Sequence, residues 1–277
     1  MGSERRRLAV LGSPIAHSKS PALHRAAYER LGLAWDYSAV EMDGRRLGEF
    51  VGALDASWRG LSLTMPLKQD VLPLLDALDE VAAITGAANT VLLDGGERRG
   101  YNTDVGGIVR TLREAGIGEA TQGVLLGGGA TAASALVAMS QLGATDVRVL
   151  VRRQGAAAPL VELGSRLGVQ VGEGGLAELA TIDRAGLVVS TVPGGTDLGV
   201  AASDGLIASA ALLDVAYDPW PTRLAADWLA GGGTVVHGLG MLLHQALLQV
   251  RIFVNGDPNA PLADEAAVLA VMRNAVS

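Results

Sequence analysis

Short apolar runs alternate with amphipathic segments along most of this 277-residue chain. Residues 7–11, 35–42 and 61–64 have the composition and length of β-strands. Ser20 and the proline that follows it would supply an N-cap and a first-turn proline for a helix that ends near Gly32. This alternation of strand and helix patterns is typical of α/β architecture.

A hairpin and a further helix are predicted next. Residues 89–93 and 98–101 flank the turn sequence at 94–97, Asp-Gly-Gly-Glu, which favours two antiparallel strands. A helix is then expected from about Thr103 to Gly116. Asp104 would lie in its first turn, where a carboxylate suits the positive end of the helix dipole.

A second block begins after residues 116–122. Its predicted strands alternate with helical patterns, and they cover residues 124–126, 147–151, 187–190, 212–215 and 234–236. This rhythm predicts a doubly wound parallel sheet. Two terminal helices, at 242–253 and 264–274, could return to the first block.

Composition narrows the classes of partner. The net charge of −7 argues against nucleic acid or an anionic membrane as the main partner. The absence of cysteine excludes disulfides and thiolate metal sites, and it fits a cytoplasmic protein. The apolar start after Arg7 is cut short by Gly12 and Pro14, so we interpret it as a strand and not as a signal peptide.

A glycine-rich turn suggests a dinucleotide site. Residues 127–132, Gly-Gly-Gly-Ala-Thr-Ala, match G-x-G-x-x-A between a predicted strand and a predicted helix. A plain tight turn is the alternative. The next strand ends in Arg152-Arg153 without the acidic residue that usually holds the ribose hydroxyl of NAD. Two guanidinium groups suit a 2′-phosphate, which favours NADP over a merely solvated basic turn.

Lysine usage suggests the group that moves a proton. Of the 22 basic residues, 20 are arginine, and the lysines are Lys19 and Lys68. Unlike arginine, lysine can release its proton and act as a base. The histidines form no zinc motif, and no tyrosine precedes a lysine by four residues, although a His–Arg–acid mechanism stays open. Lys68 is therefore the candidate base, with Asp104 as its partner, and Lys19 is expected to be solvated or to attract substrate.

Six ordered motifs resemble the shikimate dehydrogenase family over nearly the whole chain. They lie at residues 12–21, 60–68, 86–90, 100–104, 214–219 and 238–246. Residues 62–64 read Ser-Leu-Thr where the family more often has Asn-Val-Thr. The glycine turn departs slightly from the usual Gly-Ala-Gly-Gly-Ala, and Val151 and Arg153 replace the asparagine and threonine that usually flank Arg152.

The resemblance implies reversible NADP-linked reduction of 3-dehydroshikimate to shikimate, in aromatic amino-acid biosynthesis. It implies a substrate domain of residues 1–104 plus 240–277 and a Rossmann-like NADP domain of residues 105–239. Lys68 and Asp104 would form the catalytic dyad. The substrate would be bound by Ser18, Ser20, Thr64, Lys68, Asn89, Asp104, Tyr217 and Gln245. The cofactor would be bound by Gly127, Gly128, Gly129, Ala130, Thr131, Arg152, Arg153, Glu80, Val215, Gly238 and Met241.

Two rival functions remain at this stage. The first is a quinate/shikimate dehydrogenase that uses NAD, against which Ser20 and the Arg152-Arg153 pair argue. The second is a non-catalytic ligand sensor on the same fold, which would not need both Lys68 and Asp104. The expected partners are small molecules, without nucleic acid, membrane or a bound metal, and a homodimer is kept as one option for the assembly.

Overall fold

The computed structural model describes residues 5–277, and these form two compact units. Unit 1 contains the described residues up to Thr103 together with residues 242–277, and unit 2 contains residues 104–241. The divisions therefore follow Thr103 and Met241, one and two residues from the boundaries that the sequence suggested. Asp104 is consequently the first residue of unit 2.

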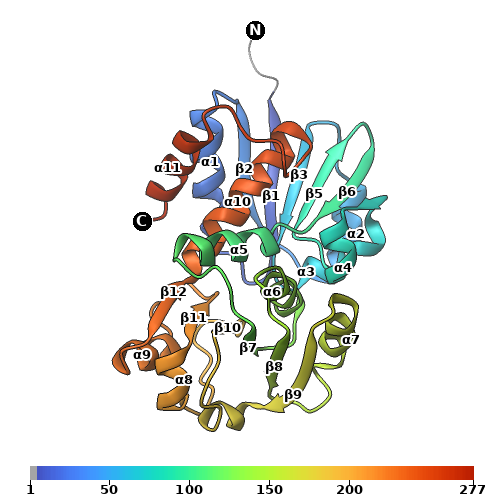
Figure 1. Ribbon diagram of the computed structural model, residues 1–277. Coiled ribbons are helices and arrows are strands. Elements are labelled where there is room, and N and C mark those ends of the chain that lie inside the picture. Colours follow the sequence, from blue (N-terminus) through green and yellow to red (C-terminus); the bar gives the residue numbers. More distant parts are fainter. Residues whose placement is uncertain (1–4) are drawn as a thin grey trace. The chain divides into compact units, whose positions relative to one another are not determined.

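Unit 1 is built on a mixed sheet whose described strands follow the order β2-β1-β3-β5-β6-β4 (Figure 1). The strands are β1 (Arg6–Gly12), β2 (Trp35–Glu41), β3 (Trp58–Leu63), β4 (Ala77–Leu78), β5 (Thr90–Asp94) and β6 (Glu97–Tyr101). The first three strands run parallel, whereas β5 runs antiparallel to β3 and β6. The predicted hairpin is present, and Gly95 and Gly96 at its turn both have positive φ.

Helices cover both faces of this sheet. They are α1 (Ser20–Arg30), α2 (Gly44–Gly52), α3 (Leu67–Asp70), the 3₁₀ turn η1 (Leu72–Leu74), α4 (Glu80–Thr85), α10 (Gly238–Asn255) and α11 (Glu265–Asn274). Leu47 of α2 and Leu67 of α3 belong to one apolar cluster with Leu61 and Leu63 of β3. Ser62 points to the opposite face because side chains alternate along a strand, and α1 and α10 cover that face.

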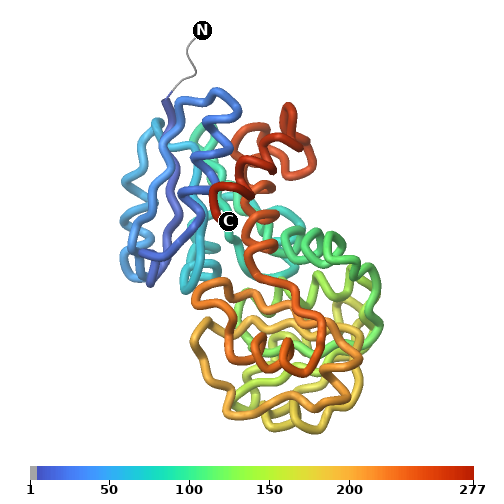
Figure 2. Tube along the Cα trace, turned by 90° about the vertical axis from the view of Figure 1, so that its left-hand side faces the viewer, coloured from blue at the N-terminus to red at the C-terminus, as the bar shows by residue number. Residues whose placement is uncertain are grey.

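The chain's last segment returns to its first. Helix α11 contacts α1, and Figure 2 shows the red C-terminal segment beside the blue N-terminal one. The return of the terminal helices to the first block is thereby confirmed. It places side chains of α10 next to strands that are about 160 residues earlier in the chain, as in the bond between Gln249 and Thr90.

Unit 2 contains a fully parallel sheet whose described strands follow the order β12-β11-β10-β7-β8-β9. The strands are β7 (Gln122–Leu126), β8 (Asp146–Val151), β9 (Gln170–Gly175), β10 (Leu187–Ser190), β11 (Ala211–Asp214) and β12 (Thr234–His237). The helices are α5 (Asp104–Glu114), α6 (Ala130–Gln141), α7 (Ala158–Leu167), the 3₁₀ helix η2 (Leu176–Ala180), α8 (Asp204–Ser209) and α9 (Arg223–Ala230). Read from the β9 edge, this is the doubly wound Rossmann order.

The predicted α/β class with a Rossmann-like unit is confirmed, and two strands were missed. The first is the two-residue strand β4, which pairs with β6. The second is β9, an edge strand whose partner among the described strands is β8. Its sequence, Gln-Val-Gly-Glu-Gly-Gly, has no apolar run, because an edge strand needs less burial than a central one. Across residues 5–277, every helix is too short or too polar to cross a membrane.

Candidate active site

One edge of the unit 1 sheet gathers several of the predicted substrate residues. Strands β1 and β3 end there, and the antiparallel β5 begins there, since Ser62 pairs with Thr90. Backbone bonds continue the sheet beyond these ends: Thr64 N donates to Leu11 O at 2.9 Å, and Leu63 N donates to Asn89 O at 2.8 Å. Segments far apart in sequence therefore meet at this edge.

Lys68 reaches this edge from the short helix α3. Leu67 N, at the start of α3, donates to Thr64 O at 2.8 Å, and Ala88 N donates to Lys68 O, also at 2.8 Å. Both Thr64 and Lys68 are half-buried. A Cβ atom at Gly12 would lie 2.3 Å from the Thr64 side chain, so glycine is required there for the two segments to approach each other. Backbone hydrogen bonds thus hold the segment of Lys68 against Thr64 on one side and against Ala88 on the other.

The loop between β1 and α1, which carries Ser18 and leads to Ser20 at the start of α1, is held by a carboxylate. Ser13 Oγ donates to Glu41 Oε1 at 2.5 Å, and Ile15 N donates to Glu41 Oε2 at 3.0 Å. Glu41 closes strand β2, so the sheet itself fixes the start of this loop. Glu41 was not predicted from the sequence, because no local pattern distinguishes a loop-binding acid from any other acid at the end of a strand.

The start of α1 differs from the prediction. Ser20 is the first helical residue, and the N-cap position is occupied by Lys19, which has helical φ and ψ and makes no side-chain cap. Ser20 is buried, and its backbone N–H lies 3.4 Å from Ser18 Oγ, so a cap by Ser20 was the wrong assignment. Lys19, which was expected to be solvated or to attract substrate, is half-buried, and its Nζ donates to Val276 O at 3.2 Å.

Asn89 lies at the centre of a buried polar cluster at the same edge. Its Nδ2 donates to Thr103 Oγ1 at 2.9 Å and, more weakly, to Gln245 Oε1 at 3.4 Å. Gln245 Nε2 in turn donates to Leu242 O at 2.9 Å, one turn earlier in α10. The structure therefore brings Asn89 and Gln245 together, 156 residues apart in sequence.

In unit 2, two predicted positions, Val215 and Gly238, meet after β11. A Cβ at Gly238 would lie 2.3 Å from Val215 O, which explains the glycine at that position. Asp214 organises this region and was not predicted. It accepts from Ala216 N and from Thr222 Oγ1, at 3.2 and 2.5 Å. Burial raises the pKa of Asp214 above its usual value, while the bond from Thr222 acts in the opposite direction.

The predicted glycine-rich turn joins β7 to α6. Gly127 has φ of +112°, a conformation that L side chains rarely adopt, and a Cβ there would lie 2.5 Å from Thr191 Oγ1. Gly128 would meet Ala156 O at 3.0 Å, whereas a Cβ at Gly129 would point into open space. Gly129 is the N-cap of α6 and offers no side chain to the helix N–H groups. A close, anion-accepting backbone of this kind suits a pyrophosphate.

Arg152 and Arg153 follow β8 and are both exposed. Within residues 5–277, neither guanidinium is in an ion pair with a carboxylate. The nearest strand contributes an acid, Glu173, but its carboxylate accepts from Gly155 N and Ala157 N at 2.5 and 3.1 Å. Glu173 thus holds the basic turn in place, and the side chains of Arg152 and Arg153 are exposed beside it.

The remaining predicted residues lie at separate places in the two units. Glu80 is exposed in the first turn of α4 in unit 1. Asp104 is buried at the start of α5, Tyr217 is half-buried in the loop after β11, and Met241 is buried in the first turn of α10, all three in unit 2. The polar cluster also includes Gln249, which the sequence reading missed. A signal was available, because Gln249 lies one helical turn after Gln245 on the same face.

The chain matches known proteins over nearly its full length. Residues 10–91 match the family model described as the shikimate dehydrogenase substrate binding domain. A shikimate dehydrogenase (NADP(+)) of Methanopyrus kandleri is 33% identical, covering 96% of this chain and 93% of that protein.

Two solved structures extend this likeness to the fold. The crystal structure of Mycobacterium tuberculosis shikimate dehydrogenase has a TM-score of 0.83 and 39% identity, covering 97% of this chain and 99% of the other. The enzyme of Thermus thermophilus, in complex with NADP(H) and shikimate, has a TM-score of 0.79 and 30% identity, covering 98% and 99%. Sequence and fold agree along the whole length, and the chain belongs to the shikimate dehydrogenase family.

Proposed function

We propose that this protein catalyses the reversible NADP-linked reduction of 3-dehydroshikimate to shikimate. The observation that carries the proposal is the buried polar cluster of Asn89, Thr103 and Gln245 at the unit 1 sheet edge. Neutral amide and hydroxyl groups can bind a polyhydroxylated ring because each substrate oxygen finds a donor or an acceptor. The Thermus thermophilus relative, which holds NADP(H) and shikimate, supports the same assignment.

In this proposal unit 1 is the substrate domain. The hydroxyl groups of Ser18 and Ser20 donate hydrogen bonds to the substrate carboxylate, and neither side chain carries a permanent positive charge. Thr64, Asn89 and Gln245 bind the ring hydroxyls and replace the hydrogen bonds to water that these hydroxyls lose on binding. Tyr217 and Asp104 of unit 2 complete the substrate set.

Lys68 and Asp104 carry the proton in the proposed reaction. In the direction of reduction, the Lys68 ammonium donates a proton to the carbonyl oxygen as that oxygen gains negative charge. In the reverse direction, the neutral amine accepts the proton of the substrate hydroxyl. Asp104 accepts a hydrogen bond from the same hydroxyl and stabilises the charged lysine. Bound NADPH supplies the hydride.

Unit 2 is the proposed NADP domain. The backbone of residues 127–129 and the start of α6, at Ala130 and Thr131, would hold the pyrophosphate. Arg152 and Arg153 would bind the 2′-phosphate by charge-assisted hydrogen bonds. The nicotinamide side would be bordered by Glu80, Val215, Gly238 and Met241.

The test is an absorbance assay at the nicotinamide band, run with shikimate or quinate and with NADP or NAD. We expect the highest kcat/KM for shikimate with NADP. Faster oxidation of quinate with NAD would favour the rival dehydrogenase, and saturable ligand binding without turnover would favour the sensor. Ser20 and the exposed Arg152-Arg153 pair support the first outcome.

Two further proposals concern the protein in the cell and in solution. We infer a cytoplasmic location, which the absence of cysteine favours. A homodimer is the proposed assembly, and light scattering on the eluting protein would measure it. A mass near 28.3 kDa at all concentrations would contradict the dimer.

A further inference from the structure

A continuous chain of buried hydrogen bonds leads from α1 to the substrate edge of unit 1. One branch runs from Tyr28 through His24 to Gln249, and a second runs from Tyr37 through Ser62 to the same Gln249. From Gln249 the chain continues through Thr90 to Asn89, the residue before β5. All of these side chains are buried. Buried polar groups are costly unless they are satisfied, so such a chain has one preferred arrangement of donors and acceptors.

Gln249 lies at the centre of this chain and uses both ends of its amide. Its Oε1 accepts from Ser62 Oγ at 2.9 Å and lies 3.1 Å from His24 Nε2. Its Nε2 donates to Asn89 O at 3.1 Å and to Thr90 Oγ1 at 3.0 Å. A backbone carbonyl can only accept, so the nitrogen end of the amide must face Asn89.

The hydroxyl of Thr90 accepts a hydrogen bond from Gln249 and therefore acts as the donor toward the side chain of Asn89. Thr90 Oγ1 already accepts from Gln249, so its own hydrogen is available for Asn89 Oδ1, 2.8 Å away. Asn89 Oδ1 also accepts from Thr103 N at 2.9 Å. With the oxygen end of the amide filled in this way, Nδ2 faces Thr103 Oγ1 and Gln245.

We propose that Thr90 and Gln249 are positioning residues that make Asn89 present its amide N–H groups, and not its oxygen, to the substrate. This proposal rests on the proposed function, in which Asn89 binds a ring oxygen of shikimate. A substrate oxygen that takes the place of Gln245 Oε1, the more distant acceptor at 3.4 Å, then meets an N–H group that is already oriented. Such preorganisation raises affinity, because no amide has to turn during binding.

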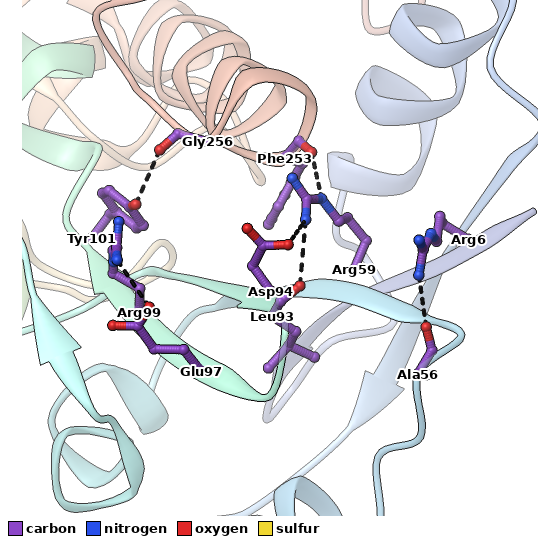
Figure 3. A network of polar contacts seen from close by, with 10 residues as sticks. All are labelled: Arg6, Ala56, Arg59, Leu93, Asp94, Glu97, Arg99, Tyr101, Phe253 and Gly256. Atoms are coloured by element: carbon purple, nitrogen blue, oxygen red, sulfur yellow. Dashed lines mark hydrogen bonds and ion pairs between the residues drawn. The ribbon is translucent and has the colours of Figure 1, made fainter. Parts of the chain in front are cut away.

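The helix that carries Gln249 is itself held in place at its C-terminal end (Figure 3). Arg59 Nε donates to Phe253 O at 2.8 Å, and the same guanidinium pairs with Asp94 at 2.9 Å. Tyr101 OH donates to Gly256 O at 3.1 Å, just beyond the helix. Strands β3, β5 and β6 therefore fix the end of α10, and with it Gln249, before any substrate binds.

The test compares Thr90→Val with Thr90→Ser. Valine keeps the volume of threonine but has no hydroxyl to donate to Asn89 Oδ1, whereas serine keeps the hydroxyl. For Thr90→Val we expect the KM for shikimate to rise about tenfold, the value of one net hydrogen bond, with kcat and the Kd of NADP changed less than about twofold. Thr90→Ser should restore a KM near that of the wild type.

Two further variants separate positioning from a general loss of stability. Tyr28→Phe removes a hydroxyl from the far end of the same chain, so it should lower Tm and leave the KM for shikimate unchanged. Gln249→Met removes the amide that orients Thr90 and should raise the KM as Thr90→Val does. It also keeps the proposal testable if the valine variant does not fold.

The results distinguish the positioning role of Thr90 and Gln249 from the proposed dehydrogenase activity. An unchanged KM in folded Thr90→Val or Gln249→Met, or an equal rise in Tyr28→Phe, would overturn the positioning role alone. Wild-type protein without shikimate-dependent reduction of NADP would instead overturn the proposed function.

Discussion

The proposed substrate edge of unit 1, where β1 and β3 end, and the glycine turn of unit 2, where β7 ends, are built from different kinds of group. At the unit 1 edge, buried side chains such as Asn89 and Gln249 hold one another in position. At the unit 2 turn, the conformation of the glycine backbone shapes the region, and the charged side chains of Arg152 and Arg153 are exposed. One site depends on a packed interior, and the other on a local conformation.

The two regions should therefore tolerate different substitutions. A side-chain site depends on partners from distant segments, so its chemistry can be lost through residues that never touch substrate. A backbone site depends on the absence of a Cβ at positions such as Gly127, and its neighbours matter less. We therefore expect substitutions at the unit 1 edge to act on substrate binding and turnover, and substitutions at the unit 2 glycine turn and the arginines beside it to act on the choice of cofactor.

The largest effect is expected at Lys68. Lys68→Met should lower kcat by about 10²–10⁴-fold, because the variant has no group to exchange a proton with the substrate oxygen. Steady-state assays give kcat, and titration with NADPH should show wild-type affinity. Turnover within a fewfold of wild type would remove Lys68 from the mechanism and leave the unit 1 edge as a binding surface only.

The second effect concerns Arg152. Arg152→Ala should weaken NADP by about 10–100-fold, the value of a hydrogen-bonded ion pair with phosphate, and should leave NAD nearly unchanged. Exposed Arg166, in the last turn of α7, gives a matched control in the same unit. Equal losses for NADP and NAD would mean that this turn does not recognise the 2′-phosphate.

A pH effect follows from His24. Burial lowers its pKa from 6.5 to about 3, against a smaller opposite effect of its bond to Gln249. The unfolded chain then binds a proton that the folded chain does not, so between pH 6.5 and about 3 stability falls as pH falls. From pH 7.5 to 5 this single group should cost about 2 kcal/mol.

His24→Phe removes this titration and gives the comparison. We expect the free energy of unfolding, measured with denaturant at both pH values, to fall less in the variant than in the wild type. Equal falls in both proteins would show that His24 titrates normally and that the interior of unit 1 is more open to water than its hydrogen bonds indicate.

The smallest expected effect is at Lys19. Lys19→Met keeps the aliphatic stem and removes the donor to Val276 O, so it should lower stability by about 0.5–1.5 kcal/mol without a large change in kcat. Thermal unfolding and the shikimate assay measure the two quantities. A loss of turnover like that of Lys68→Met would give Lys19 a part in the chemistry.

Much of the fold could be predicted because its signals are local. The central strands of unit 2 are apolar runs, and the hairpin turn at Gly95 and Gly96 is marked by its own sequence. The start of α1 and the edge strand β9 were assigned wrongly or missed. In both cases the deciding contacts come from other segments: β9 is held by β8, and Lys19 reaches Val276 near the C-terminus.

The α/β class, the doubly wound parallel sheet of the second block and the likeness to the family could be predicted from the sequence, because strand periodicity and ordered motifs are properties of neighbouring residues. The way in which Asn89 is held depends on tertiary contacts, since Thr90, Thr103 and Gln249 reach it from β5, from the loop after β6 and from α10. Hydrogen bonds between distant segments leave no periodic trace in a sequence. Such bonds form only when the folded chain brings the two partners together and removes them from water.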